Sequence, residues 1–155
     1  MNNESLYKNQ YGALYNWYTV NTGKLCPTGW HVPTYEEWVI LSNYLGGDTV
    51  SGGKFKENGT EHWKNVHDSV YNCATNESGF TALPGGSRYG REVPGYGFHN
   101  FSGNIGVIGC YWSATQVNDA TAYRPDFIYY DCTFEPSPAK YEKFYGASIR
   151  CIKDK

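Results

Sequence analysis

Apolar residues recur at helical spacing after Thr34 and predict an amphipathic helix. Residues 34–37 (TYEE) have the form of a capping box, in which the Thr34 hydroxyl and the Glu37 carboxylate bond to backbone N–H groups of the first turn. Gly46-Gly47 follows and supplies the left-handed backbone that ends a helix. The positions that form the predicted apolar stripe are Trp38, Ile40, Leu41, Tyr44 and Leu45.

The remaining segments favour short strands and loops. Aromatic and β-branched residues predict strands at residues 11–20, 80–84, 110–115, 122–130 and 145–152. Pro125 lacks a backbone donor and would restrict the fourth of these strands to a sheet edge. A second, shorter helix is predicted near residues 53–56, and loops are predicted at residues 58–79 and 89–109. Long loops without regular structure are often functional.

Composition favours an irregular, β-rich fold over a helical bundle. The chain has 155 residues, of which 18 are glycine, 15 are tyrosine and only 18% are charged. Glycine favours turns, and tyrosine favours pleated, half-buried surfaces. The length predicts one domain over residues 1–155, with residues 1–10 as a poorly ordered or extended segment.

Charge and motif content exclude several classes of partner and reaction. The formal net charge of −2 gives no electrostatic basis for binding nucleic acid. No apolar run approaches the ~20 residues that cross a bilayer, so direct membrane insertion is not expected. The sequence holds no P-loop, nucleophile elbow or dinucleotide-binding fingerprint. We therefore expect neither enzymatic activity nor a cofactor.

The histidines give no recognisable metal signature, and no metal is predicted. His31 precedes the predicted helix and is expected to make structural hydrogen bonds. His62 and His67 lie in a predicted loop beside Glu61 and Asp68, at a spacing that is poor for a metal site. The motifs of calcium-dependent sugar binding are missing, and residues 135–137 (EPS) resemble them only faintly.

The five cysteines leave two interpretations open. Neither a CxxC motif nor a zinc-type Cys/His spacing occurs. One or two disulfides with an odd thiol is the first interpretation, and five free thiols is the second, since free cysteine is often buried. The cysteines are Cys26, Cys73, Cys110, Cys132 and Cys151.

One motif resembles a known family. Residues 25–34 (LCPTGWHVPT), followed by Glu37-Trp38, are similar to the GWHxPTxxEW signature of the Fibrobacter succinogenes major paralogous domain. The resemblance covers residues 11–153, and Ala147 departs from it because the family usually has an aromatic residue there. Further elements of the family recur in order at residues 77–80 (ESGF), 82–86 (ALPGG), 111–115 (YWSAT) and 146–151 (GASIRC).

The resemblance implies an α+β fold of the C-type lectin-like type. That family looks like a relative of the formylglycine-generating enzymes, with small twisted antiparallel sheets, one or two helices, long ordered loops and paired terminal strands. It implies a Cys26–Cys151 disulfide, which would stabilise by roughly 3–5 kcal/mol. The copper-binding cysteine pair of those enzymes lacks its motif here, although Cys132 and Cys151 lie in the corresponding region.

The resemblance also implies a function. Similar domains are variable proteins of diversity-generating retroelements, whose final segment is rewritten by adenine-directed mutagenesis. Residues 123–134 contain only residue types that such rewriting produces, although a tyrosine-rich strand pair would also avoid the others by chance. Within the candidate variable segment, residues 117–145, the positions that would have to be fixed are Glu135, Lys140, Glu142 and Lys143.

We therefore expect a non-enzymatic ligand-binding domain, secreted or displayed on a bacterial cell or phage particle, with an unidentified protein or carbohydrate ligand. The alternative is an invariant carbohydrate- or cell-wall-binding module of a secreted bacterial protein; residues 1–5 do not resemble a signal peptide. The predicted contact residues are Val117, Asp119, Tyr123, Arg124, Asp126, Phe127, Tyr129, Tyr130, Asp131, Phe134 and Tyr141.

The composition of this segment suits a binding surface, because tyrosine offers a large rigid contact area at low entropic cost. A strand alternates its faces, so at least one of Tyr129 and Tyr130 should be exposed. Five of the contact residues are predicted to form one contiguous exposed patch. They are Tyr123, Arg124, Phe127, Tyr129 and Phe134.

Overall fold

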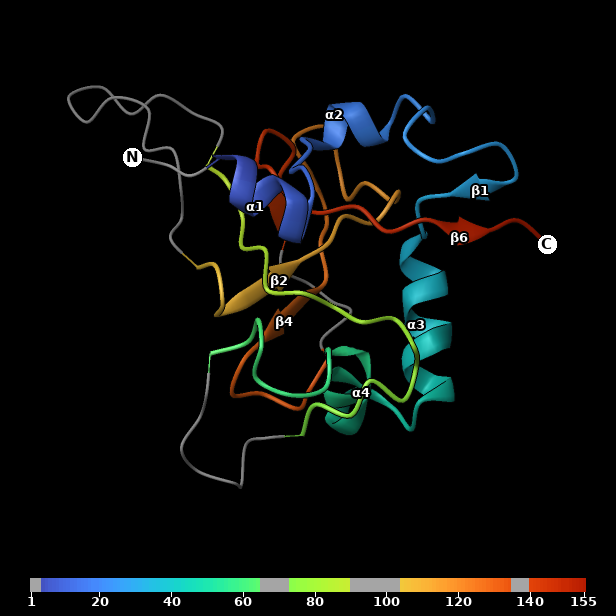
Figure 1. The fold of residues 1–155 in the computed structure, drawn as a ribbon. Coiled ribbons are helices and arrows are strands. Elements are labelled where there is room, and N and C mark those ends of the chain that lie inside the picture. The colour runs from blue at the N-terminus through green and yellow to red at the C-terminus, as the bar shows by residue number, and fades with distance from the viewer. Residues whose placement is uncertain (1–3, 65–72, 90–103, 135–139) are drawn as a thin grey trace.

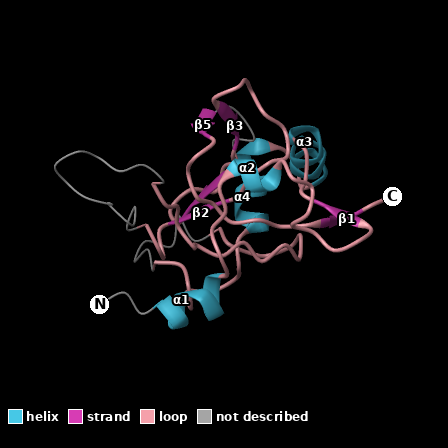
Figure 2. Cartoon of the chain, turned by 90° about the horizontal axis from the view of Figure 1, so that it is seen from above, coloured by secondary structure: helices cyan, strands magenta, loops and turns pink. Residues whose placement is uncertain are grey.

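The computed structural model describes residues 4–64, 73–89, 104–134 and 140–155 (Figure 1). The fold is α+β, and most of the chain between its short elements is loop (Figure 2). No helix in these ranges is long and apolar enough to span a bilayer. The helices are α1 (Glu4–Tyr11), α2 (Trp17–Val20), α3 (Tyr35–Tyr44) and α4 (Asp48–Phe55). The strands are β1 (Trp30–His31), β2 (Ile108–Cys110), β3 (Thr121–Tyr123), β4 (Asp126–Ile128), β5 (Lys140–Glu142) and β6 (Ile152–Lys153).

The strands form antiparallel pairs, and one of these pairs joins distant parts of the chain. Within the described ranges the pairs are β1–β6, β2–β4 and β3–β5. In β1–β6, Trp30 lies opposite Lys153 and His31 opposite Ile152. A further antiparallel bridge links Tyr15 to Ala147. The two ends of the domain are therefore paired, as the sequence predicts.

Helix α3 forms for the reasons visible in its sequence. Thr34 Oγ1 accepts from Glu37 N at 3.2 Å, and Glu37 Oε2 accepts from Thr34 N at 2.9 Å, which confirms the capping box. Gly46 and Gly47 have φ of 103° and 89° after the helix, as the sequence predicts. The predicted apolar stripe is wrong at Ile40 and Tyr44, which face solvent.

Aromatic rings build the larger of two hydrophobic clusters, here called the aromatic core. Trp38 of α3 lies at its centre, with ring centroids of five other aromatic residues between 5.4 and 6.5 Å away. Such tilted ring pairs stabilise beyond the area that they bury. The buried members are Trp38, Leu45, Phe55, Trp63, Ala82, Tyr111, Phe127 and Phe134.

A second cluster holds the N-terminal segment to the C-terminal half. Trp17 Nε1 donates to Ser113 O at 2.9 Å, and Trp112 Nε1 donates to Tyr15 O at 2.8 Å. Both bonds span more than 90 residues of sequence. The buried members are Trp17, Val20, Val32, Cys110, Trp112, Ala122 and Ala147.

Several predicted elements are wrong in type or extent. Residues 11–20 form no strand, because Asn16 accepts from Thr19 N at 3.0 Å and begins helix α2. The segment before residue 11, expected to be poorly ordered or extended, is helical from Glu4 onward. The predicted helix near residues 53–56 exists but begins earlier, at Asp48.

The predicted strands are shorter than expected. Residues 122–130 do not form one strand: β3 and β4 are separated at Arg124-Pro125 and pair with β5 and β2 respectively. Residues 80–84 contribute only the isolated bridge of Ala82 to Lys56. In the predicted strand at residues 110–115, only Cys110 belongs to a strand, and the predicted 145–152 strand consists of isolated bridges before β6. Most of the predicted loop at residues 89–109 lies outside the described residues.

Two disulfides connect the described segments. The Cys26–Cys151 bond closes 125 residues and confirms the pairing that the family resemblance implies. The Cys73–Cys132 bond closes 59 residues. Cys110 is the odd thiol, and its burial raises its pKa. Two disulfides fit an oxidising environment.

Helix α4 packs so closely on the Cys73–Cys132 region that two of its glycines have no room for a side chain. A Cβ atom on Gly52 would overlap Thr133 O, and one on Gly53 would overlap Cys73 O. Gly53 N also donates to Cys132 O at 3.2 Å. Both obstacles are backbone atoms, so the neighbouring chain has to shift to accept a methyl group.

Gly52→Ala is therefore expected to lower the free energy of unfolding by about 1–3 kcal/mol, although alanine is ordinarily the better residue in a helix. Urea unfolding followed by tryptophan fluorescence measures the change. Thr49→Ala, at an exposed position of the same helix, is the matched control and should stay within about 0.5 kcal/mol of the parent. A gain in stability from Gly52→Ala would contradict the close contact.

Candidate functional site

The predicted contact residues separate into a surface set and a buried set. Asp119 and Tyr130 are exposed. The half-buried members are Val117, Tyr123, Asp126, Tyr129, Asp131 and Tyr141. The buried members are Arg124 (6% exposed), Phe127 (1%) and Phe134 (0%). The predicted patch of five exposed side chains is wrong, because these three belong to it and lie inside.

Phe127 and Phe134 are part of the aromatic core. Their rings stack on each other at 5.3 Å between centroids, with 19° between the ring planes. Phe127 is the middle residue of β4, so alternation along the strand turns its side chain inward. Phe134 N donates to Asp48 O at 2.7 Å, which fixes the chain against the start of α4. Neither ring can contact a ligand in this structure.

Arg124 organises the region between β3, β4 and β5. Its Nε and Nη2 donate to the two carboxylate oxygens of Asp126 at 3.0 and 2.9 Å. Its guanidinium carbon lies 3.2 Å from the centroid of the Tyr141 ring, and Tyr141 Oη donates to Asp126 Oδ2 at 2.7 Å. Burial, together with the nearby Asp126 charge, raises the pKa of Tyr141 to about 12. Arg124 therefore supports the surface from within.

The tyrosine pair, Tyr129 and Tyr130, includes the one aromatic residue among the predicted contact residues that is exposed. Tyr130 is 48% exposed, which confirms that one of the two must face outward. The rings meet edge to face at 4.9 Å, and Lys64 Nζ lies 5.3 Å from the centroid of the Tyr129 ring. Tyr129 N also donates to Val107 O at 2.9 Å, so the backbone is anchored beneath the rings.

Lys56 fixes the turn that carries the tyrosine pair. This buried side chain donates from Nζ to Ile128 O at 3.0 Å and to Asp131 O at 2.7 Å. Burial lowers the pKa of Lys56 to about 8. Two carbonyls on either side of the pair are thus held by one buried amine. The backbone that carries the tyrosine pair is therefore ordered in the absence of a ligand.

A polar turn forms the other end of the surface set. Asn118 Oδ1 accepts from the N–H groups of Ala120 and Thr121, both at 2.9 Å, and this closes the turn that presents Asp119. Beyond the turn, the Tyr123 ring stacks on Tyr35 at 4.4 Å. The turn at Asn118 and Asp119 therefore offers polar side chains on a backbone that hydrogen bonds hold in place.

The two cysteines considered from the sequence as a copper-binding pair are not free thiols. Cys132 and Cys151, which lie in the region of a copper-binding cysteine pair in similar enzymes, are each bonded to a different cysteine. The faint lectin-like motif at residues 135–137 lies outside the described residues.

His31 makes the structural hydrogen bonds expected of it. Its Nδ1 lies 2.6 Å from Asp154 Oδ1, and its Nε2 lies 3.0 Å from both Glu37 oxygens. The bond to Asp154, followed by that to Glu37, raises the pKa of His31. The histidine thus links the start of α3 to the C-terminal segment.

Sequence reasoning missed the partner of His62. It grouped His62 with Glu61, His67 and Asp68, and the last two lie outside the described residues. The structure instead places Glu57 Oε2 2.7 Å from His62 Nδ1. The sequence feature that could have indicated the Glu57–His62 contact is Gly59. Its positive φ of 94° turns the chain between these two residues.

Comparison with known proteins gives one family. A family model described as the Fibrobacter succinogenes major domain matches residues 1–153. No curated protein and no solved structure matches the chain.

Proposed function

The chain belongs to the Fibrobacter succinogenes major domain family, and from this premise we propose that it is a non-enzymatic ligand-binding domain. Its contact surface is the exposed part of residues 117–145, centred on the tyrosine pair. One observation carries the proposal. The rings of Tyr129 and Tyr130 meet edge to face at the surface, and the buried Lys56 amine hydrogen-bonds to the backbone on both sides of them.

This arrangement reduces the cost of binding. Tyrosine has few rotatable bonds, so little side-chain entropy is lost when its ring contacts a partner. Lys56 and the buried rings of Phe127 and Phe134 already order the backbone, and preorganisation raises affinity by removing that cost. Lys64 and Asp131 add charge beside the rings. The proposed ligand is a protein or carbohydrate with both apolar and polar groups.

Within this class, we propose a variable protein of a diversity-generating retroelement, displayed on a bacterial cell or phage particle. Diversification would be limited to the surface set, because rewriting Arg124, Phe127 or Phe134 would disrupt the interior. Their burial is also the observation that favours the second candidate, an invariant carbohydrate- or cell-wall-binding module. A reverse transcriptase gene and a near-copy template repeat in the flanking DNA would support the first candidate. Their absence would support the second.

Tyr130→Ala is expected to weaken binding at least tenfold, because exposed aromatic residues at the centre of an interface contribute most of its energy. The purified domain is screened against arrayed bacterial glycans, peptidoglycan fragments and a displayed random-peptide library. Affinities of the retained probes are then measured for each variant.

Tyr44→Ala is the matched control, because Tyr44 is 85% exposed on α3, outside the proposed surface. It should bind the retained probes as the parent does, and both variants should unfold at the parent's urea midpoint. The proposal is wrong if the two tyrosine variants lose affinity equally. It is also wrong if no probe of any class is retained.

A further inference from the structure

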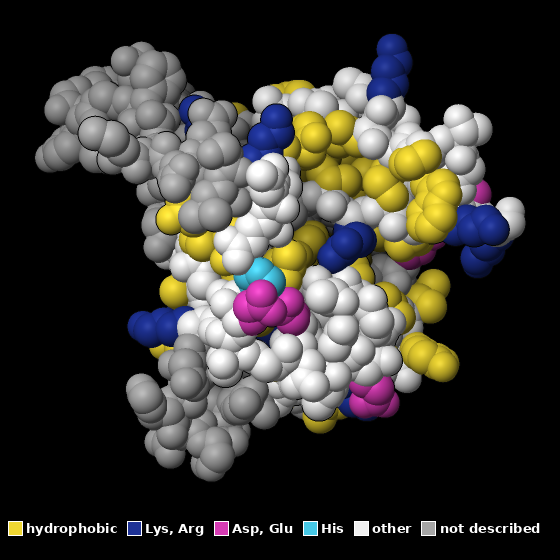
Figure 3. Space-filling model, in the orientation of Figure 1, with side chains coloured by type: hydrophobic (Ala, Val, Ile, Leu, Met, Phe, Trp, Pro, Cys, Tyr) yellow, Lys and Arg dark blue, Asp and Glu magenta, His cyan; other side chains and the backbone are white. Residues whose placement is uncertain are grey.

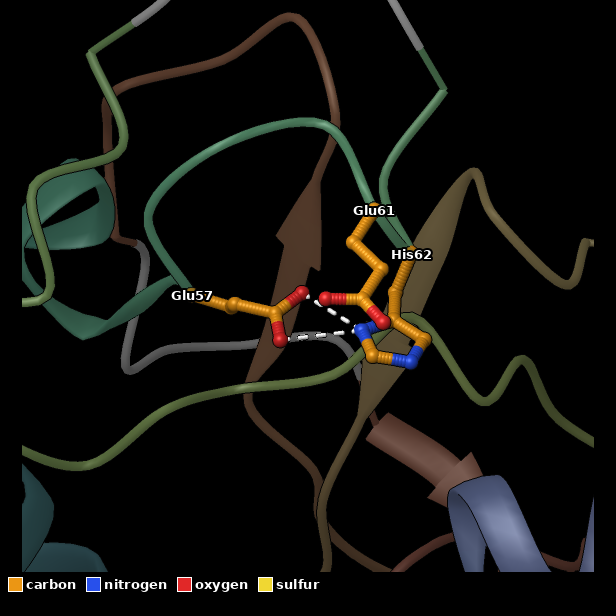
Figure 4. Close-up of side chains that lie close together, drawn as sticks. All are labelled: Glu57, Glu61 and His62. Carbon is orange, nitrogen blue, oxygen red and sulfur yellow. Dashed lines mark hydrogen bonds and ion pairs between the residues drawn. The ribbon is translucent and has the colours of Figure 1, made fainter.

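Two carboxylates and one imidazole lie close together within residues 57–62. They belong to Glu57, Glu61 and His62, here called the Glu–His cluster (Figure 4). One ligand atom from each of the three residues lies within 4.8 Å of the others. On the face seen in Figure 3, a histidine side chain lies beside acidic side chains at the surface.

The local fold sets the distance between Glu57 and His62. Glu57 N and Trp63 Nε1 both donate to the carbonyl of Ala82, at 3.1 and 3.0 Å. Residues 57 and 63 are therefore fixed to one point of the neighbouring chain. Gly59 turns the loop between them with its positive φ of 94°. The cluster is thus anchored at both ends: at Glu57 by its backbone N–H and at residue 63 by the Trp63 side chain, which belongs to the aromatic core.

Two of the three side chains are largely withdrawn from water. The His62 side chain is 14% exposed and the Glu57 side chain 16% exposed. His62 Nδ1 lies 2.9 and 2.7 Å from the two oxygens of Glu57. The Tyr11 ring packs edge-on against the imidazole at 5.7 Å and limits its rotation. Glu61 approaches from the solvent side and is free to adjust.

The donor set matches a transition-metal ion better than calcium or magnesium. Imidazole nitrogen with carboxylate oxygen is typical of zinc and its neighbours, whereas calcium and magnesium prefer all-oxygen sites. Zinc binds such atoms at about 2.1 Å in a tetrahedron, which places the ligand atoms about 3.4 Å apart. To reach that spacing, His62 Nδ1 and the Glu57 carboxylate, now 2.7 Å apart, would separate slightly, and the exposed Glu61 side chain can adjust to complete the site.

We propose that the Glu–His cluster is a binding site for one divalent transition-metal ion, with Zn²⁺ the best fit. Glu57, Glu61 and His62 each supply one ligand, and His62 binds through Nδ1 as the neutral imidazole with its proton on Nε2. The two carboxylates balance the charge of the ion. Three protein ligands leave a fourth position for water or for an anionic group of another molecule. The site shares no ligand residue with the tyrosine pair, so metal binding and ligand binding can be tested separately.

The test is calorimetric titration of ZnCl₂ into the intact, chelator-treated chain. One site per chain with micromolar or tighter affinity is expected. Glu57→Gln and Glu61→Gln, which preserve side-chain shape, should each weaken binding at least tenfold, and His62→Ala should do the same. Addition of ZnCl₂ should also raise the thermal midpoint of the parent but not of these variants.

His31→Gln is the control for adventitious binding to a surface histidine. Its two ring nitrogens face Asp154 and Glu37 on opposite sides, so the three residues cannot share one ion. This variant should bind Zn²⁺ as the parent does. The proposal is overturned if the chain binds no Zn²⁺ at 100-fold molar excess, prefers CaCl₂, or retains full affinity in Glu57→Gln and Glu61→Gln. Because Glu61 is exposed, its variant keeps the test decisive even if a change at His62 impairs folding.

Discussion

Phe127→Ala is expected to lower the free energy of unfolding by about 3–5 kcal/mol, the loss typical of removing a large ring from a packed core. The Phe127 side chain is 1% exposed, and its ring lies 5.3 Å from Phe55, 5.3 Å from Phe134 and 6.3 Å from Trp38. The neighbouring rings belong to different segments that are fixed by backbone bonds and a disulfide, so they cannot collapse into the space. Urea unfolding followed by tryptophan fluorescence measures the loss.

Two variants make this result specific. Phe127→Leu keeps most of the buried volume and should cost about 1.5 kcal/mol or less. Tyr130→Ala, three residues away but exposed, should change stability by less than about 0.5 kcal/mol. The expected order separates the two roles of aromatic residues in this segment: Phe127 affects folding and Tyr130 affects binding. Equal stability of the Phe127→Ala and Tyr130→Ala proteins would contradict the buried position of Phe127.

Helix α3 could be predicted from the sequence because the interactions that define it are local. The capping box joins Thr34 to Glu37, and the glycines that end the helix follow it directly. The exposure of Ile40 and Tyr44 could not be predicted from local interactions. A run of apolar residues on a helix does not specify how much of its surface neighbouring segments cover, and that depends on chain far away in sequence.

The short strands could not be located because their pairing is not local. The sequence predicts one strand at residues 122–130, yet β3 pairs with β5 and β4 with β2. Strands of two or three residues give too few alternating positions for a period to be recognised. Their ends are set by contacts between distant segments, such as the 2.9 Å bond from Lys143 N to Ala120 O just before β3.

The candidate surface was predicted in part. One member of the tyrosine pair is exposed as predicted, although both residues lie in the turn after β4 and strand alternation does not cause it. Composition could not distinguish Phe127 and Phe134 from contact residues, because large aromatic side chains suit both a core and a binding surface. The Cys73–Cys132 pairing was equally beyond the sequence, since cysteine spacing does not determine connectivity. The Cys26–Cys151 bond was implied by family resemblance alone.

Replacement of both Cys26 and Cys151 by serine is expected to lower the free energy of unfolding by about 3–5 kcal/mol. The bond closes 125 residues of chain, so it removes many conformations from the unfolded state. It lies beside the β1–β6 pair, which has only two residues in each strand and cannot hold the chain ends together unaided. Urea unfolding of the double variant and the parent, both without reductant, measures the loss.

The Cys73→Ser/Cys132→Ser protein is the informative comparison. Loop-closure entropy changes slowly with length, so a loop of 59 residues should contribute only about 0.7 kcal/mol less than one of 125 residues. A much larger loss would mean that this bond acts through the folded state, where Gly53 packs against Cys73 and donates to Cys132. Cys110→Ala leaves both disulfides intact and should unfold with the parent's dependence on reductant. If reductant leaves the parent's urea midpoint unchanged, the two bonds do not support the fold, and the stability must come from the aromatic core alone.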